Sequence, residues 1–233
     1  MKRIRKKYRL NIKLKDKLLI ILVLLVVSII YVFKIFNERA KPLFMEYSTV
    51  EVEKLVTLVV NSTVNDIISK DKNMDNIFTS ENNINNKALN SITYNSLKYV
   101  KLNLKYLEEG KIDKLTINKN IFDDYNIKKL KKGIVYELPS GVIFNNPITM
   151  NVLPKIPVKL NIIGSLAADI DTSIEEYGIN SALFKVDLNI HMTVKILLPF
   201  TSKDTKIDTK IPIVIKIIEG KVPSLYLDKN LVN

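Results

Sequence analysis

The residues of this chain that could do chemistry are few, and they gather in its last third. His191 is the sole histidine, cysteine is absent, and carboxylates stand in pairs at Asp169 and Asp171 and at Glu175 and Glu176. Paired carboxylates can bind Ca²⁺ or act as general acid and base, whereas a Ser/His/Asp triad would need His191 as its base. A zinc site is disfavoured, because the chain has no cysteine and one histidine.

Both candidates fall on the polar side of predicted strands. Asp169 and Asp171 are two residues apart and therefore share a face of a strand, and His191 alternates with apolar neighbours on a flat, wet face. We interpret these side chains as solvated, and six glycines leave little room for a phosphate-binding loop. The sequence thus predicts no enzyme and no catalytic, cofactor-binding or metal residue. A hydrolase of peptidoglycan or other glycans that uses Asp169, Asp171 or Glu175 is the weakest of three hypotheses.

Three long alternating segments predict the strands that carry these side chains. The clearest is 184–198, where eight apolar residues alternate strictly: Phe184, Val186, Leu188, Ile190, Met192, Val194, Ile196 and Leu198. Residues 156–170 alternate likewise, with Gly164 as a bulge or bend, and residues 205–218 place five isoleucines on one face: Ile207, Ile211, Ile213, Ile215 and Ile217. A turn at 177–180 and a hairpin connection at 199–204 join them. We therefore predict a long, twisted antiparallel sheet with one dry and one wet face.

A helix is predicted to cover the dry face. From residue 43 to 69 apolar residues recur every three or four positions, which is typical of an amphipathic helix. Core packing against the sheet is the simplest role for it, and oligomerisation or contact with a membrane surface are the alternatives.

The segment between this helix and the long strands is harder to interpret. Residues 70–90 form a polar loop or two short helices. Alternating residues over 100–117, with a turn at 108–110, predict a hairpin, and residues 120–132 predict a helix that ends at Gly133. The fold class is therefore α+β.

The N-terminus has the pattern of a membrane anchor. Nine Lys or Arg residues and one acid occupy residues 1–17, and an uncharged apolar run follows from Leu18 to Phe33. A helix of about 19 residues, at 1.5 Å per residue, matches a hydrocarbon core of about 30 Å, and the preceding positive charge stays in the cytoplasm. We predict a basic cytoplasmic tail at 1–17, an uncleaved transmembrane signal anchor at 18–36 and an extracytoplasmic α+β domain at 43–233. A cleaved signal peptide is the alternative, although no small-residue cleavage site follows the apolar run.

The anchor also accounts for the basic composition. The chain carries a net charge of +12, of which residues 1–17 supply +8. Nucleic-acid binding therefore loses its main support. Without cysteine, the outer domain has no disulfides, so its core must suffice to hold the fold.

Short motifs in the last third resemble a known family. They are Leu153-Pro154-Lys155-Ile156-Pro157, Gly164, Glu176-Tyr177-Gly178-Ile179-Asn180, Pro199-Phe200 and Glu219-Gly220-Lys221-Val222-Pro223 with Tyr226. In kind and order they are similar to those of the YunB family of sporulation proteins, which has Gly where this chain has Leu153. The resemblance implies a single-pass membrane protein without enzymatic activity. It would be made during endospore formation, with its domain facing the space between the two membranes around the forespore.

Two further hypotheses of function follow. The first is a non-enzymatic assembly or structural factor, anchored in the mother-cell membrane that surrounds the forespore through residues 18–36, with other sporulation membrane or envelope proteins as partners and no cofactor. The alternative is a lipid-binding protein that uses an apolar groove between helix 43–69 and the sheet.

Overall fold

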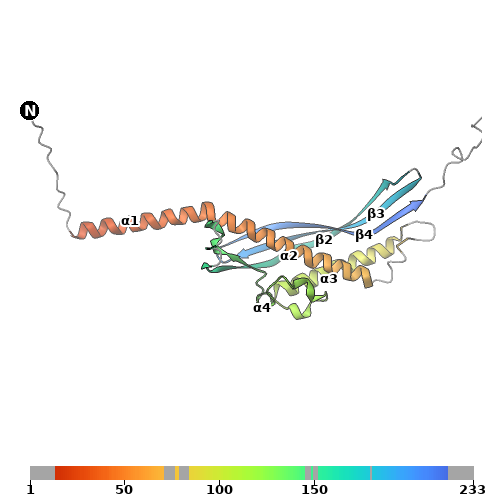
Figure 1. Cartoon of the computed structure of the whole chain (residues 1–233), viewed down its shortest axis with the longest axis horizontal. Coiled ribbons are helices and arrows are strands. Elements are labelled where there is room, and N and C mark those ends of the chain that lie inside the picture. The colour runs from red at the N-terminus through yellow and green to blue at the C-terminus, as the bar shows by residue number, and fades with distance from the viewer. Residues whose placement is uncertain are drawn as a thin grey trace, which may run out of the picture. The chain divides into compact units, whose positions relative to one another are not determined.

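The computed structural model describes residues 14–70, 77–78, 84–144, 148, 152–178 and 180–219 (Figure 1). It divides into two compact units, Met1–Phe44 and Met45–Asn233, which are described separately.

The first unit contains the apolar helix. Helix α1 spans Leu14–Ile35, and a π-helical turn at Phe36–Ala40 follows it. Every side chain of α1 is exposed, and the length and composition of the helix are those of a membrane-crossing segment. The helix predicted over 18–36 is confirmed as a helix, and Phe36, the last residue of the predicted segment, belongs to the π-helical turn. The basic tail before Leu14 lies outside the described residues.

Helix α2, Lys41–Lys70, confirms the helix predicted over 43–69. Its fully buried apolar residues recur every three or four positions: Val52, Leu55, Val56, Val59, Val60 and Val64. Thr63 lies on the same stripe and accepts a hydrogen bond of 3.0 Å from Nδ2 of the buried Asn103. Asn103 belongs to helix α3, Asn86–Glu108, so this bond joins the two helices.

Helix α3 shows that the predicted hairpin over 100–117 is wrong. The alternation that suggested a strand covers seven residues, whereas the buried positions of the whole segment follow a helical period: Ala88, Leu89, Ile92, Ser96, Val100, Asn103, Leu104 and Leu107. Asn85 caps the helix by accepting a hydrogen bond from the backbone N–H of Ala88. The predicted return strand contains a 3₁₀ turn at Ile112–Lys114 instead.

The helix predicted over 120–132 is divided into two short pieces. A 3₁₀ helix covers Lys119–Phe122 and helix α4 covers Ile127–Leu130. The side chain of Asn126 accepts a hydrogen bond from the backbone N–H of Lys129, which starts α4 afresh. The predicted stop at Gly133 is confirmed, because this residue has φ +68°.

Four antiparallel strands form one sheet in the order β1-β2-β3-β4. Figure 1 labels the long strands β2, β3 and β4. They span Tyr136–Pro139 (β1), Lys155–Glu176 (β2), Ser181–Leu198 (β3) and Thr201–Glu219 (β4). The last three contain the predicted strands and extend them, and the turn between β3 and β4 is only Pro199–Phe200, shorter than the predicted connection. The predicted α+β fold with a long antiparallel sheet on helices is confirmed.

Two irregularities set which residues share a face. The pairing of β2 with β3 shifts between Ile163 and Ala167, beside Gly164 at φ +79°, so the predicted bulge is confirmed. The pairing of β3 with β4 shifts as well, because Asp187 lies opposite Pro212 whereas Val186 lies opposite Val214.

The second shift moves two isoleucines of β4 from the predicted dry face to the polar face. Beyond the bulge, Ile215 and Ile217 lie opposite Lys185 and Leu183, which belong to the polar face of β3. Both isoleucines are exposed, whereas Ile207, Ile211 and Ile213 are buried. The prediction that all five isoleucines share a face is therefore wrong, because the extra residue in β4 reverses the alternation.

The dry face of the sheet is the core of the second unit. All eight alternating apolar residues of β3, from Phe184 to Leu198, are buried. Helix α3 packs against β2, and the carboxylate of Glu108 accepts a hydrogen bond of 3.2 Å from the backbone N–H of Ile162. Phe78 packs edge-on against Phe184, with a distance of 5.6 Å between the ring centroids.

Candidate functional site

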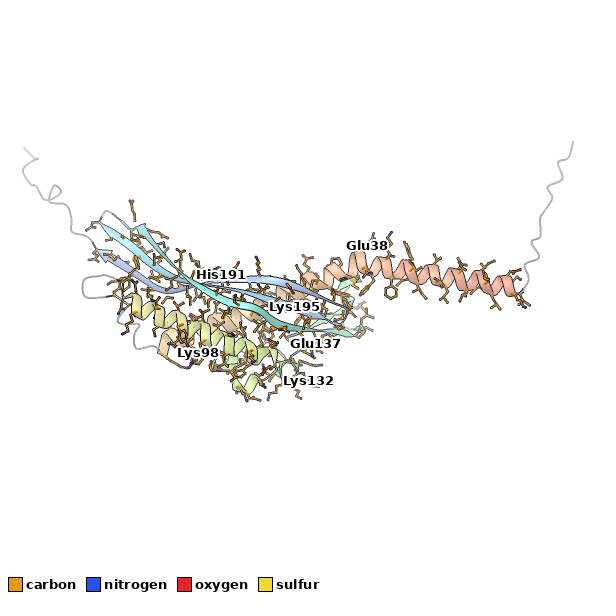
Figure 2. The ribbon with its side chains drawn as sticks, turned by 180° about the vertical axis from the view of Figure 1, so that it is seen from behind. Glu38, Lys98, Lys132, Glu137, His191 and Lys195 are labelled. Carbon is orange, nitrogen blue, oxygen red and sulfur yellow. The ribbon has the colours of Figure 1, made fainter. Side chains whose placement is uncertain are left out.

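The polar face of the sheet brings most of the predicted chemical residues together. Nδ1 of His191 lies 2.7 Å from Oδ1 of Asp208 on β4, and its Nε2 lies 3.5 Å from Oδ2 of Asp169 on β2. The three side chains come from adjacent strands, with Asp208 directly opposite His191 in the register. His191 thus bridges two carboxylates across the sheet, in the middle of β3, the strand that also carries Lys195 (Figure 2).

Two more of the predicted carboxylates, Asp171 and Glu175, pair with lysines on other strands. Nζ of Lys210 lies 2.9 Å from Oδ2 of Asp171 and 3.1 Å from Oδ2 of Asp187, and these two hydrogen bonds raise the pKa of Lys210. Lys185 binds Glu175 at 2.7 Å. We call these pairs, with the His191 contacts, the ion-pair ladder.

The ion-pair ladder is an arrangement suited to holding strands together. Opposite charges on neighbouring strands stabilise a sheet, and exposure to solvent keeps the contribution of each pair small. The side chain of His191 is 45% exposed and lies on an open strand face. Within the part of the chain that the structure describes, it contacts carboxylates, whereas a catalytic triad needs a hydroxyl nucleophile beside the histidine. Among the described residues, no group of three or more His, Cys, Asp or Glu side chains is placed to hold a metal ion.

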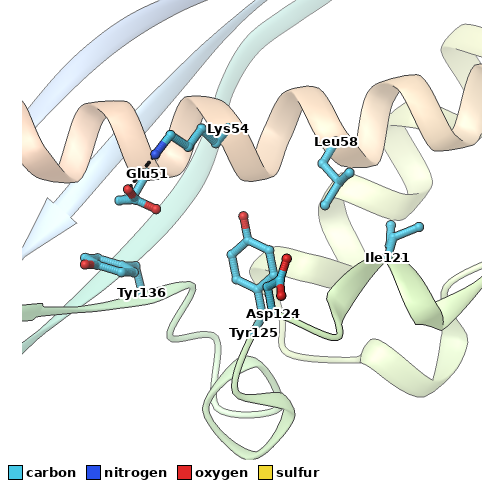
Figure 3. A pocket seen from close by; sticks show the side chains of 7 residues that line it. All are labelled: Glu51, Lys54, Leu58, Ile121, Asp124, Tyr125 and Tyr136. Carbon is cyan, nitrogen blue, oxygen red and sulfur yellow. Dashed lines mark hydrogen bonds and ion pairs between the residues drawn. The ribbon is translucent and has the colours of Figure 1, made fainter.

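A pocket at the side of helix α2 was missed by the sequence analysis. It has a volume of about 370 Å³ and is lined by Glu51, Lys54, Leu58, Ile121, Asp124, Tyr125 and Tyr136 (Figure 3). Nζ of Lys54 donates a hydrogen bond of 2.9 Å to Oε1 of Glu51, which raises the pKa of Lys54. Burial raises the pKa of both Tyr125 and Tyr136, so both phenols stay protonated at neutral pH and can donate hydrogen bonds.

The pocket escaped notice because its parts are distant in the chain. Glu51 and Lys54 look like the solvated side of an amphipathic helix, and the tyrosines flank the short helix α4 some 70 to 85 positions later. The pocket joins two aromatic rings to an ion pair and one further carboxylate, Asp124. Such a lining can hold a small polar molecule through stacking and hydrogen bonds.

The family motifs fall where strands begin and turn. Pro154 directly precedes β2, Tyr177 and Gly178 follow it, and Pro199 with Phe200 forms the turn between β3 and β4. Gly178 has φ +80°, a conformation that favours glycine. The last motif, from Gly220 to Tyr226, lies outside the described residues. The resembling residues thus shape the ends of the sheet.

Together these features define an α+β protein with an exposed apolar N-terminal helix and a long antiparallel sheet whose polar face carries cross-strand ion pairs. Residues 135–225, which begin just before β1, match the family model described as Sporulation protein YunB (Spo_YunB). The chain is also 28% identical over 199 residues to the Sporulation protein YunB of Bacillus subtilis (strain 168), across 82% of this chain and 73% of that protein. Both matches confirm the resemblance to the YunB family of sporulation proteins that the motifs predicted. No solved structure matches it.

Proposed function

We propose that this protein is a membrane-anchored, non-enzymatic assembly or structural factor of endospore formation. Helix α1 would hold it in the mother-cell membrane around the forespore, with the basic tail in the cytoplasm and the sheet unit outside. The match of residues 135–225 to a sporulation family carries the proposal. The apolar composition of α1 supports the anchor, since no side chain of this helix is buried.

The arrangement of the polar face supports a role without catalysis. Asp169, Asp171 and Glu175, the acids considered for a hydrolase, each lie within 3.5 Å of a cationic or imidazole nitrogen on another strand. Each of these acids therefore takes part in a contact between strands of the sheet, which is the arrangement expected of a structural role. If the ion-pair ladder is structural, the triple variant Asp169→Asn, Asp171→Asn, Glu175→Gln should give a normal spore yield, provided that the protein accumulates to a normal level. A loss of spores with normal protein level would favour the hydrolase.

Deletion of the gene in its spore-forming host tests the proposed function. Growth should be normal and the yield of heat-resistant spores should fall, and the intact gene should restore the yield. A matched variant, in which residues 1–36 are replaced by a cleavable signal peptide, should be exported and fail to restore it. Normal spore yield after deletion would contradict a role in sporulation, and full rescue by the cleaved variant would contradict the need for an anchor.

The lipid-binding alternative gains no specific support. An open groove along the dry face would expose the apolar side chains of β3, but all eight are buried, from Phe184 to Leu198. Mass spectrometry of the purified chain after detergent exchange would detect an acyl chain retained in stoichiometric amount. A lipid found in that amount would revive the alternative.

A further inference from the structure

The register of the strands brings two connections to the same end of the sheet. Pro139 pairs with Lys155, so the 3₁₀ helix at Ser140–Phe144, which follows β1, and Val152, which comes three residues before β2, lie where β2 starts. Leu198 pairs with Thr201, and β2 starts beside the end of β3, because Lys159 pairs with Leu197. The turn at Pro199–Phe200 therefore lies at this end as well, whereas the turn between β2 and β3 lies at the other end.

This end exposes apolar side chains. Val152 is 77% exposed and Ile148 is 72% exposed, and Ile143 and Phe200 are exposed as well. We call these four residues the apolar end. The sequence from Leu138 to Pro154 contains no charged residue, in a chain in which 26% of all residues are charged. Several exposed apolar side chains at one place indicate a surface that another apolar phase covers.

The part of helix α2 that belongs to the second unit, from Met45 onward, starts at the same end of that unit. Glu51 and Lys54, in its first half, line a pocket with Tyr136 of β1. Phe78, which follows the helix in the chain, packs against Phe184 near the opposite end of the sheet. Within the second unit, the helix thus runs from the apolar end toward the far end.

Chain length limits how far this end can lie from the membrane. Met45, the first residue of the second unit, comes ten positions after Ile35, the last residue of α1. Ten residues span at most about 35 Å even when fully extended. A bilayer that holds α1 therefore lies within reach of the end of the unit that carries Met45.

We propose that the apolar end contacts the surface of the bilayer in which α1 is anchored. Val152 and Ile148 would enter the boundary between headgroups and acyl chains, and the exposed Lys155 and Lys203 beside them would face anionic headgroups. The proposal rests on the proposed anchor, since that anchor supplies the bilayer. It adds a second contact, which fixes the end of the sheet that faces the membrane.

Single tryptophans test this contact, because the chain has none of its own. The full chain with Val152→Trp is reconstituted in vesicles of phosphatidylethanolamine and phosphatidylglycerol, with and without brominated acyl chains. Ile174→Trp is the matched control, since Ile174 is 69% exposed and lies beside the opposite turn. We expect bromine to reduce the emission of the Val152→Trp chain by about twofold, because an interfacial side chain sits about 5–10 Å into the bilayer boundary. The emission of the Ile174→Trp chain should stay unchanged.

Further arms separate the possible failures. Adding Ile148→Asp to the Val152→Trp chain should restore most of the quenched emission, if Ile148 and Val152 enter the bilayer together. Equal, weak quenching of the two tryptophan variants in a properly inserted chain would overturn the contact but leave the anchor standing. Loss of the chain from vesicles on alkaline washing would overturn the anchor itself. A second copy of the chain could cover the apolar end instead of lipid. In that case bromine would not quench the tryptophan at position 152, and its shielding from water would increase with the protein-to-lipid ratio. That result would overturn the proposal.

Discussion

The reversal of alternation in β4 yields a direct stability comparison between two isoleucines of one strand. Ile211 is 4% exposed and pairs with Leu188 on the dry face, whereas Ile215 is 60% exposed and pairs with Lys185 on the polar face. Truncation of a buried isoleucine to alanine typically costs about 2–5 kcal/mol, whereas exposed positions change stability by roughly 0.5 kcal/mol. The loss of strand propensity is common to both variants and cancels in the difference.

We therefore expect Ile211→Ala to destabilise the sheet unit by about 2–3 kcal/mol more than Ile215→Ala. With a urea m-value of about 2 kcal/mol per molar, this difference separates the two unfolding midpoints by about 1–1.5 M. The full chain in mild detergent is unfolded in urea and followed by far-ultraviolet circular dichroism. Equal m-values confirm that the two variants expose the same surface. Equal midpoints would refute the bulge and restore the prediction that both residues share a face.

Two further predictions concern the segment that follows α3. Gly110→Ala should destabilise the chain more than Gly178→Ala by roughly 1–3 kcal/mol. Both glycines have positive φ, so the backbone strain is common to the two variants. A Cβ at Gly110 would lie 2.5 Å from the carbonyl oxygen of Lys131, whereas a Cβ at Gly178 would have no atom within 4 Å. Equal midpoints in the same urea assay would contradict this. The hydrogen bond and charge of Lys131 lower the pKa of Asp113, so this pair stabilises the fold above the unfolded-state pKa of Asp113 and the effect is lost as pH falls through the folded-state pKa. Lys131→Met should move the carboxyl NMR titration of Asp113 to higher pH, and an unmoved titration would show that Lys131 is not the cause.

The sequence was sufficient to predict the long strands, because apolar and polar residues alternate over most of the length of each one. It also indicated the apolar helix, the helix over 43–69 and the bulge at Gly164. It failed at residues 100–117, where a short alternation was compatible with both periods. Contacts with residues distant in the chain favour helix α3 over a strand, such as the hydrogen bonds of the buried Asn103 with Thr63 and Thr116.

The candidate sites were less predictable than the fold. The placement of His191 and Asp171 on the polar side of their strands followed from alternation alone. Their partners on β4, Asp208 for His191 and Lys210 for Asp171, depend on the register of that strand, which no local pattern sets. The bulge beside Pro212 was missed, although a proline inside a strand is itself a signal of an edge strand or a bulge. The pocket of Tyr125 and Tyr136 joins residues far apart in the chain and required the tertiary structure.

The most direct test of an external sheet unit held by α1 is labelling of single cysteines in intact cells. The chain contains no cysteine, so Asn90→Cys, on the exposed side of α3, and Lys7→Cys, in the basic tail, each report one position. A membrane-impermeant maleimide should label the cysteine at position 90 in intact cells and the cysteine at position 7 only after lysis, on a chain of full length. Labelling of position 7 in intact cells, protection of position 90, or a chain shortened by removal of α1 would contradict the proposed anchoring.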